Sequence, residues 1–195
     1  MSGLPHDPYE RVRREEDVLQ RVVEEISSEL ELRPLLTRIV MHACVLLDAD
    51  DGSIGLYDPA RHVVRIEAVY RMPAQELGAE YRAGSGLAGV VLAGGKPIVV
   101  RRYGDVPGTA LSELRENAVI GLPIRGRTGL MGFFGIGARP PREFDERDVA
   151  TLTLFARHAA VAIDNAMRYR REKARSERME LIARVSRLVS AGLEP

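Results

Sequence analysis

The chain has 195 residues, of which 45% are hydrophobic and 29% are charged, a composition typical of one globular domain with helical extensions. The 28 basic and 28 acidic residues cancel, so no net field attracts nucleic acid or an anionic membrane surface. The only cysteine, Cys44, can form neither an intrachain disulfide nor a cysteine-based metal cluster.

The N-terminus predicts no signal peptide, because residues 1–7 lack a basic segment followed by an apolar one. No apolar run approaches the ~20 residues that a membrane span needs. We therefore expect no membrane span in this chain, no nucleic-acid partner and a cytoplasmic location.

Residues 9–30 predict a charged helix with an apolar stripe. Val12, Leu19 and Ile26 recur every seven residues, which is the spacing of a coiled-coil seam. An apolar stripe of this length needs a partner, so we predict that residues 1–31 form a signalling helix of a homodimer. An exposed helix face on a monomer is the alternative.

A second helix is predicted from Pro34 to about Leu47, and the apolar period then changes to two. Asp50-Asp51-Gly52 is a turn signal. Ser53–Asp58 and His62–Tyr70 alternate like strands and are joined by a turn, which predicts a hairpin.

The glycine-rich segment Arg82–Gly95 predicts a short apolar helix that ends at two glycines. A short strand is expected over Pro97–Arg101 and a helical turn near Leu111–Arg115. Ala118–Arg125 and Leu130–Ala138 predict a second hairpin.

Asp145 is a good N-cap for a last helix that we expect to run to about Ala191, roughly 70 Å at 1.5 Å per residue. A small domain cannot bury such a length alone. The segment 182–194 also repeats the pattern of the segment 19–31, so residues 170–195 are predicted to be a linker helix leading to a further module. Chance similarity between two amphipathic helices is the alternative.

The order of these elements resembles the GAF domain family over about residues 32–169. The segments that carry the resemblance are Ala83–Val91, Gly95–Val100, Ala118–Ile124, Leu130–Ile136, Phe144–Asp148 and Ala159–Asn165. The resemblance implies an α+β fold of GAF/PAS type. In this fold the N- and C-terminal helices pack on one face of a central antiparallel sheet, and loops and short helices cover a pocket on the other.

The resemblance also implies a regulatory sensor domain of a cytoplasmic signalling protein, such as a two-component or phytochrome-like kinase, with a separate output domain. The family includes binders of cyclic nucleotides, bilins, haem and small metabolites, so the small-molecule ligand stays unknown. The alternative is a structural dimerisation or spacer module whose pocket is filled by its own side chains. We expect no enzymatic activity, although a pocket with two titratable groups of shifted pKa would revive that possibility.

The predicted ligand contacts come from elements that should border the pocket, although each strand residue could face either way by one register step. They are Tyr57, Tyr70, Gly86, Leu87, Val100, Tyr103, Ile120, Leu122 and Phe133. Gly84–Gly89 could hold an anion at a helix N-terminus, or could be a close-packed turn and cap. Arg101, Arg102 and Arg115 could meet an anionic ligand or lie in solvent.

The sequence favours neither a bound metal nor a covalently attached cofactor. No two of the four histidines have metal-ligand spacing. Cys44 lies among apolar helix residues, where an inert thiol is expected. Bilin-binding and methionine sulfoxide-reducing relatives carry their cysteines elsewhere, and Phe144-Asp145-Glu146 lacks the Asn-Lys pair that precedes it in cyclic-nucleotide binders.

Overall fold

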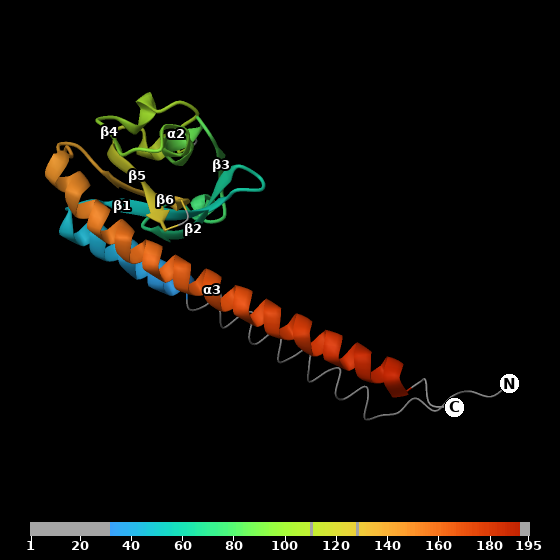
Figure 1. Ribbon diagram of the computed structural model, residues 1–195. Coiled ribbons are helices and arrows are strands. Elements are labelled where there is room, and N and C mark those ends of the chain that lie inside the picture. The colour runs from blue at the N-terminus through green and yellow to red at the C-terminus, as the bar shows by residue number, and fades with distance from the viewer. Residues whose placement is uncertain (1–31, 110, 128, 192–195) are drawn as a thin grey trace.

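The computed structural model describes residues 32–109, 111–127 and 129–191, and for residues 183 and 185–191 it describes the backbone alone (Figure 1). One six-stranded antiparallel sheet has the order β3-β2-β1-β6-β5-β4. Its strands are β1 (Asp51–Asp58), β2 (Val63–Tyr70), β3 (Glu80–Arg82), β4 (Ile98–Val100), β5 (Ala118–Gly126) and β6 (Gly129–Ala138). The other elements are the helix over residues 32–46, α2 (Gly86–Gly94), α3 (Glu146–Ala191), and the 3-10 turns η1 (Ala74–Glu76), η2 (Tyr103–Asp105) and η3 (Ser112–Leu114).

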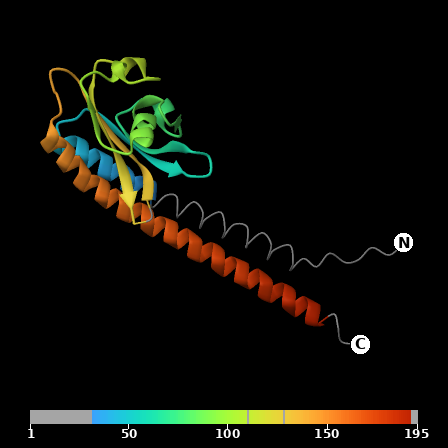
Figure 2. The same ribbon diagram turned by 45° about the horizontal axis from the view of Figure 1, so that its top comes forward.

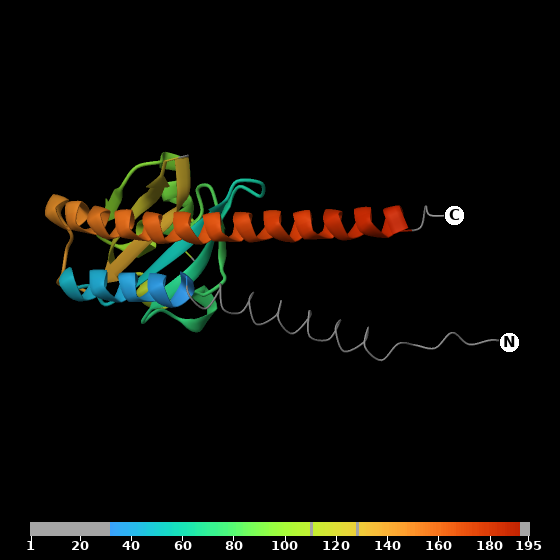
Figure 3. The same cartoon turned by 60° about the horizontal axis from the view of Figure 1, so that its bottom comes forward.

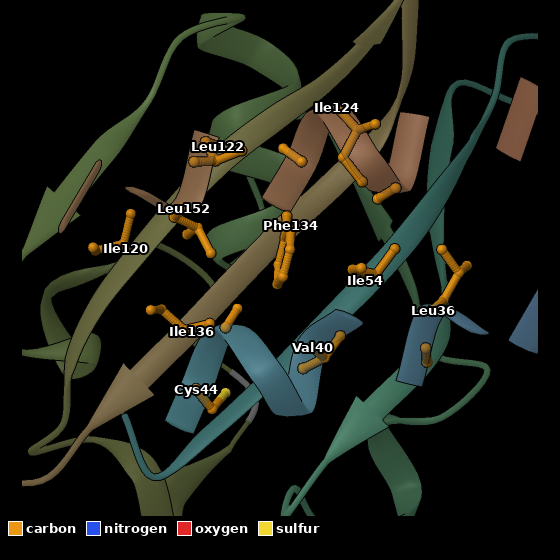
Figure 4. Close-up of a cluster of buried hydrophobic side chains, with 14 of the residues drawn as sticks. Leu36, Val40, Cys44, Ile54, Ile120, Leu122, Ile124, Phe134, Ile136 and Leu152 are labelled. Carbon is orange, nitrogen blue, oxygen red and sulfur yellow. The ribbon is translucent and has the colours of Figure 1, made fainter. Parts of the chain in front are cut away.

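One face of the sheet is covered by the helix over residues 32–46 and by the first half of α3, which lie side by side (Figures 1 and 3). Figure 4 shows the core between these helices and the sheet, where Leu36, Val40 and Leu152 meet Ile54 and Phe134. All five side chains are fully buried. The predicted α+β fold with both helices on one face is therefore confirmed.

The opposite face carries α2 and the 3-10 turns over a second core. Leu87 and Val91 of α2 pack there with Val64, Val119 and Phe133 from the sheet. The central strands are thus buried on both faces, so their sequences are almost continuously apolar.

Both predicted hairpins form. Between β1 and β2, the Oδ1 atom of Asp58 accepts the amide N–H groups of Ala60 at 2.9 Å and Arg61 at 3.2 Å, which fixes the turn. The edge strand β3 has only three residues and was not predicted, because so short a segment shows no period.

The start of α3 is fixed by reciprocal caps. Asp145 Oδ1 accepts the N–H of Asp148 at 3.0 Å, and Asp148 Oδ2 accepts the N–H of Asp145 at 2.8 Å. Arg142 donates to Asp148 at 2.7 Å and to the Leu47 carbonyl at 3.1 Å, and so ties the first helix to α3.

α3 is one continuous helix of 46 residues, as the sequence predicts, and its second half projects beyond the sheet (Figure 2). No helix in the described part of the chain is both long and apolar enough to cross a membrane. The predicted signalling helix over residues 1–31 lies outside the described residues. The division of the chain into segments 1–31, 32–169 and 170–195 stays a prediction.

Two glycines of α2 differ in what surrounds them. A Cβ atom on Gly89 would lie 2.0 Å from the Arg82 carbonyl oxygen, whereas one on Gly94 would meet nothing closer than the Lys96 side chain at 3.8 Å. We expect Gly89→Ala to lower the free energy of unfolding by about 1–3 kcal/mol, because the backbone of β3 must move.

Gly94→Ala is the matched control and should raise the free energy of unfolding by up to about 1 kcal/mol, because alanine favours the helix. Urea unfolding monitored by circular dichroism measures both. Equal shifts for the two variants would contradict the close approach of α2 to β3.

Candidate functional site

A cavity of about 40 Å³ lies between the sheet and α2. Asp51 and Ser53 of β1 and Phe133 of β6 line its floor, and Leu87 and Ala88 of α2 line its cover. A water molecule needs about 10–15 Å³ of such space, so the cavity has room for a few waters or a ligand group of similar size.

Asp51 is the first residue of β1, and its carboxyl group is 6% exposed at the wall of the cavity. Its Oδ2 atom accepts a hydrogen bond from Asn117 Nδ2 at 3.0 Å. Burial, and then the neighbouring charge of Asp50, raise the pKa of Asp51 from 3.8 to about 6, against smaller opposing effects of Asn117 and Arg139. The expected turn at Asp50-Asp51-Gly52 is wrong for Asp51 and Gly52, which are buried residues of β1.

Glu76 supplies a second buried carboxyl group to the same cavity, from η1. The hydroxyl group of Tyr81 on β3 donates to Glu76 Oε2 at 2.6 Å. Burial raises the pKa of Glu76, and the bond from Tyr81 opposes this shift. Burial, and then the hydrogen bond to Glu76, raise the pKa of Tyr81.

Glycines of β6 leave the space that the cavity occupies. A Cβ atom on Gly135 would lie 2.4 Å from the ring of Phe133, and one on Gly137 would lie 2.7 Å from Asp51 Oδ1. Gly137 is paired with Asp51 across the β1–β6 ladder. A side chain there would displace the carboxylate, so this glycine keeps Asp51 in place.

Of the nine predicted ligand contacts, Leu87, Tyr103 and Phe133 line the cavity. Tyr57 and Val100 pack against the second core beside it. These positions agree with the predicted pocket, and a ligand contact at any of them stays a prediction.

Gly86 opens α2 with a φ of +63°, and a Cβ atom there would lie 2.8 Å from the ring of Tyr81. It therefore serves a close-packed turn, which is the alternative that the sequence left open for the glycine-rich segment.

Three of the predicted contacts lie on the other side of the sheet. Ile120 and Leu122 are fully buried in the core beneath the helices, and Tyr70 packs against that core. The reason is the register of β5, in which Val119 faces the cavity and the next residue faces the helices. The prediction that Ile120 and Leu122 face the pocket is therefore wrong by one residue of register.

The candidate arginines also lie away from the cavity lining. Arg102 donates twice to Glu116, at 3.1 and 2.7 Å, and Arg101 lies 3.5 Å from Glu143. Arg115 is exposed.

Cys44 lies on the helix side of the sheet (Figure 4). Its thiol donates to the main-chain carbonyl of Asp51 at 3.3 Å, and burial raises its pKa to about 12. Such a thiol carries almost no thiolate at neutral pH and is therefore a poor nucleophile. In the described part of the chain, no three His, Cys, Asp or Glu residues are grouped so that they could hold a metal ion.

The raised pKa of Asp51 gives a prediction on stability. The unfolded chain loses this proton near pH 3.8, but the folded chain keeps it up to about pH 6. The folded state therefore binds more protons in this window, and stability should fall as the pH rises through it. At 1.36 kcal/mol per pKa unit, the loss is about 3 kcal/mol at most.

Urea unfolding at a series of pH values measures the free energy of unfolding of the wild type and of Asp51→Asn. The wild-type value minus the variant value should fall as the pH rises from about 4 to 6. Asp48→Asn, an exposed carboxyl three residues away, is the matched control and should follow the wild type. A difference curve that rises with pH would mean that the Asp51 carboxylate is stabilised by the fold.

Comparison with known proteins connects this geometry to a family. The family model for the GAF domain matches residues 13–164. No curated protein sequence matches the chain.

Among solved structures, the chain is similar to the GAF domain of a phosphoenolpyruvate-protein phosphotransferase from Coxiella burnetii. The two are 23% identical with a TM-score of 0.64, over 78% of this chain and 94% of that one. The second GAF domain of DevS from Mycobacterium smegmatis is 20% identical with a TM-score of 0.59, over 71% of this chain and 97% of that one.

A free methionine-R-sulfoxide reductase from Neisseria meningitidis, solved with its substrate, is 17% identical with a TM-score of 0.62, over 87% of this chain and 98% of that one. At these identities the likeness to solved structures concerns the fold. The match of the family model covers more than half of the sequence, and the chain belongs to the GAF domain family.

Proposed function

We propose that this chain is a regulatory sensor domain of a cytoplasmic signalling protein. In this proposal a small molecule binds in the cavity, and the signal passes through the sheet to the flanking helices and on to an output domain. The observation that carries the proposal is that β6 contributes consecutive residues to both places: Phe133 lines the cavity, and Phe134 lies in the core beneath the helices.

Asp51 on β1 also links the cavity to the helix layer. Its carboxyl group faces the cavity, while its main-chain carbonyl accepts the thiol of Cys44 on the first helix. A ligand that changes the position of this carboxyl group also changes the contact between β1 and that helix. The response is then a population shift between two helix arrangements. The ligand changes the free-energy difference between them by at most the difference in its binding free energy for the two arrangements.

The outer face of the two helices supports a homodimer. Val161 and Leu154 are seven residues apart on α3 and are 61% and 55% exposed. Val45 and Leu46, on the adjoining helix, are also exposed. Large exposed apolar side chains on adjoining helices are typical of a protein–protein contact. Dimerised helices would then carry the signal between two copies of the domain.

A spacer module without a ligand is the second candidate, and the small volume of the cavity favours it. At about 40 Å³, the cavity is far below the ~300–1,000 Å³ of ordinary ligand pockets. The two buried carboxyl groups favour the sensor, because a pocket with no ligand has no use for them.

An enzyme of the sulfoxide reductase type receives no support from the cysteine. The cavity holds two carboxyl groups of raised pKa, but the chain's one thiol lies across the sheet from it. The two carboxyl groups of raised pKa meet the condition under which the sequence left an enzyme open, so an enzyme of another type stays the third candidate, ranked after the sensor and the spacer.

Sedimentation of the full chain at tens of micromolar tests the dimer. We expect a dimer for the wild type and a monomer for Val161→Arg, because an arginine in the apolar contact would place two like charges together. Val99→Arg is the matched control, since Val99 is a partly exposed valine on the edge strand β4, and this variant should stay dimeric. A monomeric wild type would contradict the proposal.

A further inference from the structure

The cavity has an unbalanced set of charged groups. Asp51 and Glu76 line it, and no Arg, Lys or His residue lines it in the part of the chain that the structure describes. The basic group that acts on the pKa of Asp51 is Arg139, and its effect is smaller than that of burial or of Asp50. Two acidic groups thus share a space without a counter-charge in its wall.

The acceptors in this wall also have few donors. An ionised carboxylate has about four lone-pair sites, yet each group receives one side-chain hydrogen bond: Asp51 from Asn117 and Glu76 from Tyr81.

Ser53 adds a polar group of its own to the cavity. It is 4% exposed, and its hydroxyl makes no hydrogen bond within the described residues. No side-chain polar atom of the described residues is both fully enclosed and unpaired, so the Ser53 hydroxyl is open to the cavity that the two carboxyl groups line. It can therefore accept a hydrogen bond from a molecule bound there.

The remaining walls are apolar. Leu87, Leu111 and Phe133 enclose the polar groups, and apolar walls strengthen any electrostatic contact made inside them. A neutral apolar ligand would leave the carboxyl groups unpaired, and an anion would be repelled by both. A metal ion lacks a third protein ligand of the His, Cys, Asp or Glu type in the described residues.

We propose that the cavity binds the cationic N–H group of a small organic amine, with the Asp51 and Glu76 carboxylates and the Ser53 hydroxyl as its acceptors. The inference rests on the proposed function and names the class of ligand that the sensor recognises. A primary ammonium group suits the site because it has three donors and can meet three acceptors. The volume of about 40 Å³ fits the head group and a short carbon chain.

Three probes of nearly equal size test the charge preference: ethylammonium, ethanol and acetate. Chemical-shift titrations of the backbone amides of the full chain at pH 8 and constant ionic strength measure their affinities. We expect ethylammonium to bind at least about tenfold more tightly than either other probe, a difference of 1.4 kcal/mol. Equal or tighter binding of ethanol or acetate would overturn the proposal, as would no binding of ethylammonium.

Variants test the named acceptors. Asp51→Asn and Glu76→Gln keep the shapes of the side chains, and each should weaken ethylammonium binding by about tenfold or more. Ser53→Ala should weaken binding while leaving the fold intact, because no other protein group loses a hydrogen-bond partner when this hydroxyl is removed. Glu113→Gln, an exposed carboxyl outside the cavity, is the control and should change nothing. Unchanged affinity in all three cavity variants would overturn the proposal.

A pH series adds an independent readout. Asp51 faces Asn117, Asp50 and Arg139, and its carboxyl group gains a proton below about pH 6. Ethylammonium keeps its charge throughout this range, so its affinity should be lower at pH 5 than at pH 8 in the wild type, and this dependence should be reduced in Asp51→Asn. An affinity that rises on acidification would contradict an ionised Asp51 as acceptor.

A spin label on α3 separates the two proposals. The label is attached to Tyr169→Cys, because Tyr169 is exposed while the Cys44 thiol is buried and does not react with the label. Ethylammonium binding without a change in label mobility would reject the relay and keep the ligand class. A change in label mobility on binding acetate in place of ethylammonium would reject the ligand class and keep the relay.

Discussion

The central strands β5 and β6 are buried on both faces, and the other parts of the molecule depend on this constraint. Each apolar side chain of these strands packs into one core or the other. A shift of the strand register by one residue would move every side chain to the opposite core. The helices on one side and α2 on the other are held by consecutive residues of the same strands. Because the interior is close-packed, a displacement in either layer presses on the strands that both layers share.

Buried acidic groups act against this packing. Asp51 and Glu76 lose hydration without gaining a cationic partner, and their raised pKa values express that cost. The fold tolerates them because Asn117 and Tyr81 each supply one donor and because Gly137 leaves room for a carboxylate. A domain that served only as scaffold would be more stable with apolar groups at these two positions. Their presence is the observation on which the proposed ligand site depends.

Local patterns predict much of this fold. The helices over residues 32–46 and α3 show apolar spacing over several turns, and Asp145 marks a start that its hydrogen bonds confirm. The two long hairpins follow from strand-like segments joined by turn signals. The family resemblance adds the order of the layers, which no single segment determines.

The site is harder to predict because its polar groups depend on contacts between distant segments. β5 is apolar on both faces, so the sequence contains no polar alternation that would tell Val119 from Ile120. Asp51 stands in a run typical of a turn. Glu76 lies in a short 3-10 turn, and its hydrogen-bond partner Tyr81 comes from a three-residue strand that the sequence pattern does not reveal.

The length of α3 has a mechanical consequence. A helix without a break behaves as a rod, so rotation at the sheet is carried to its far end undiminished. Over the last 24 residues, roughly 36 Å, a tilt of about 5° displaces the tip by about 3 Å. A small tilt of α3 where it packs on the sheet thus becomes a displacement of about 3 Å at the far end of the helix. The projecting second half of α3 is the arm of this movement, and the pivot lies where the first half packs on the sheet.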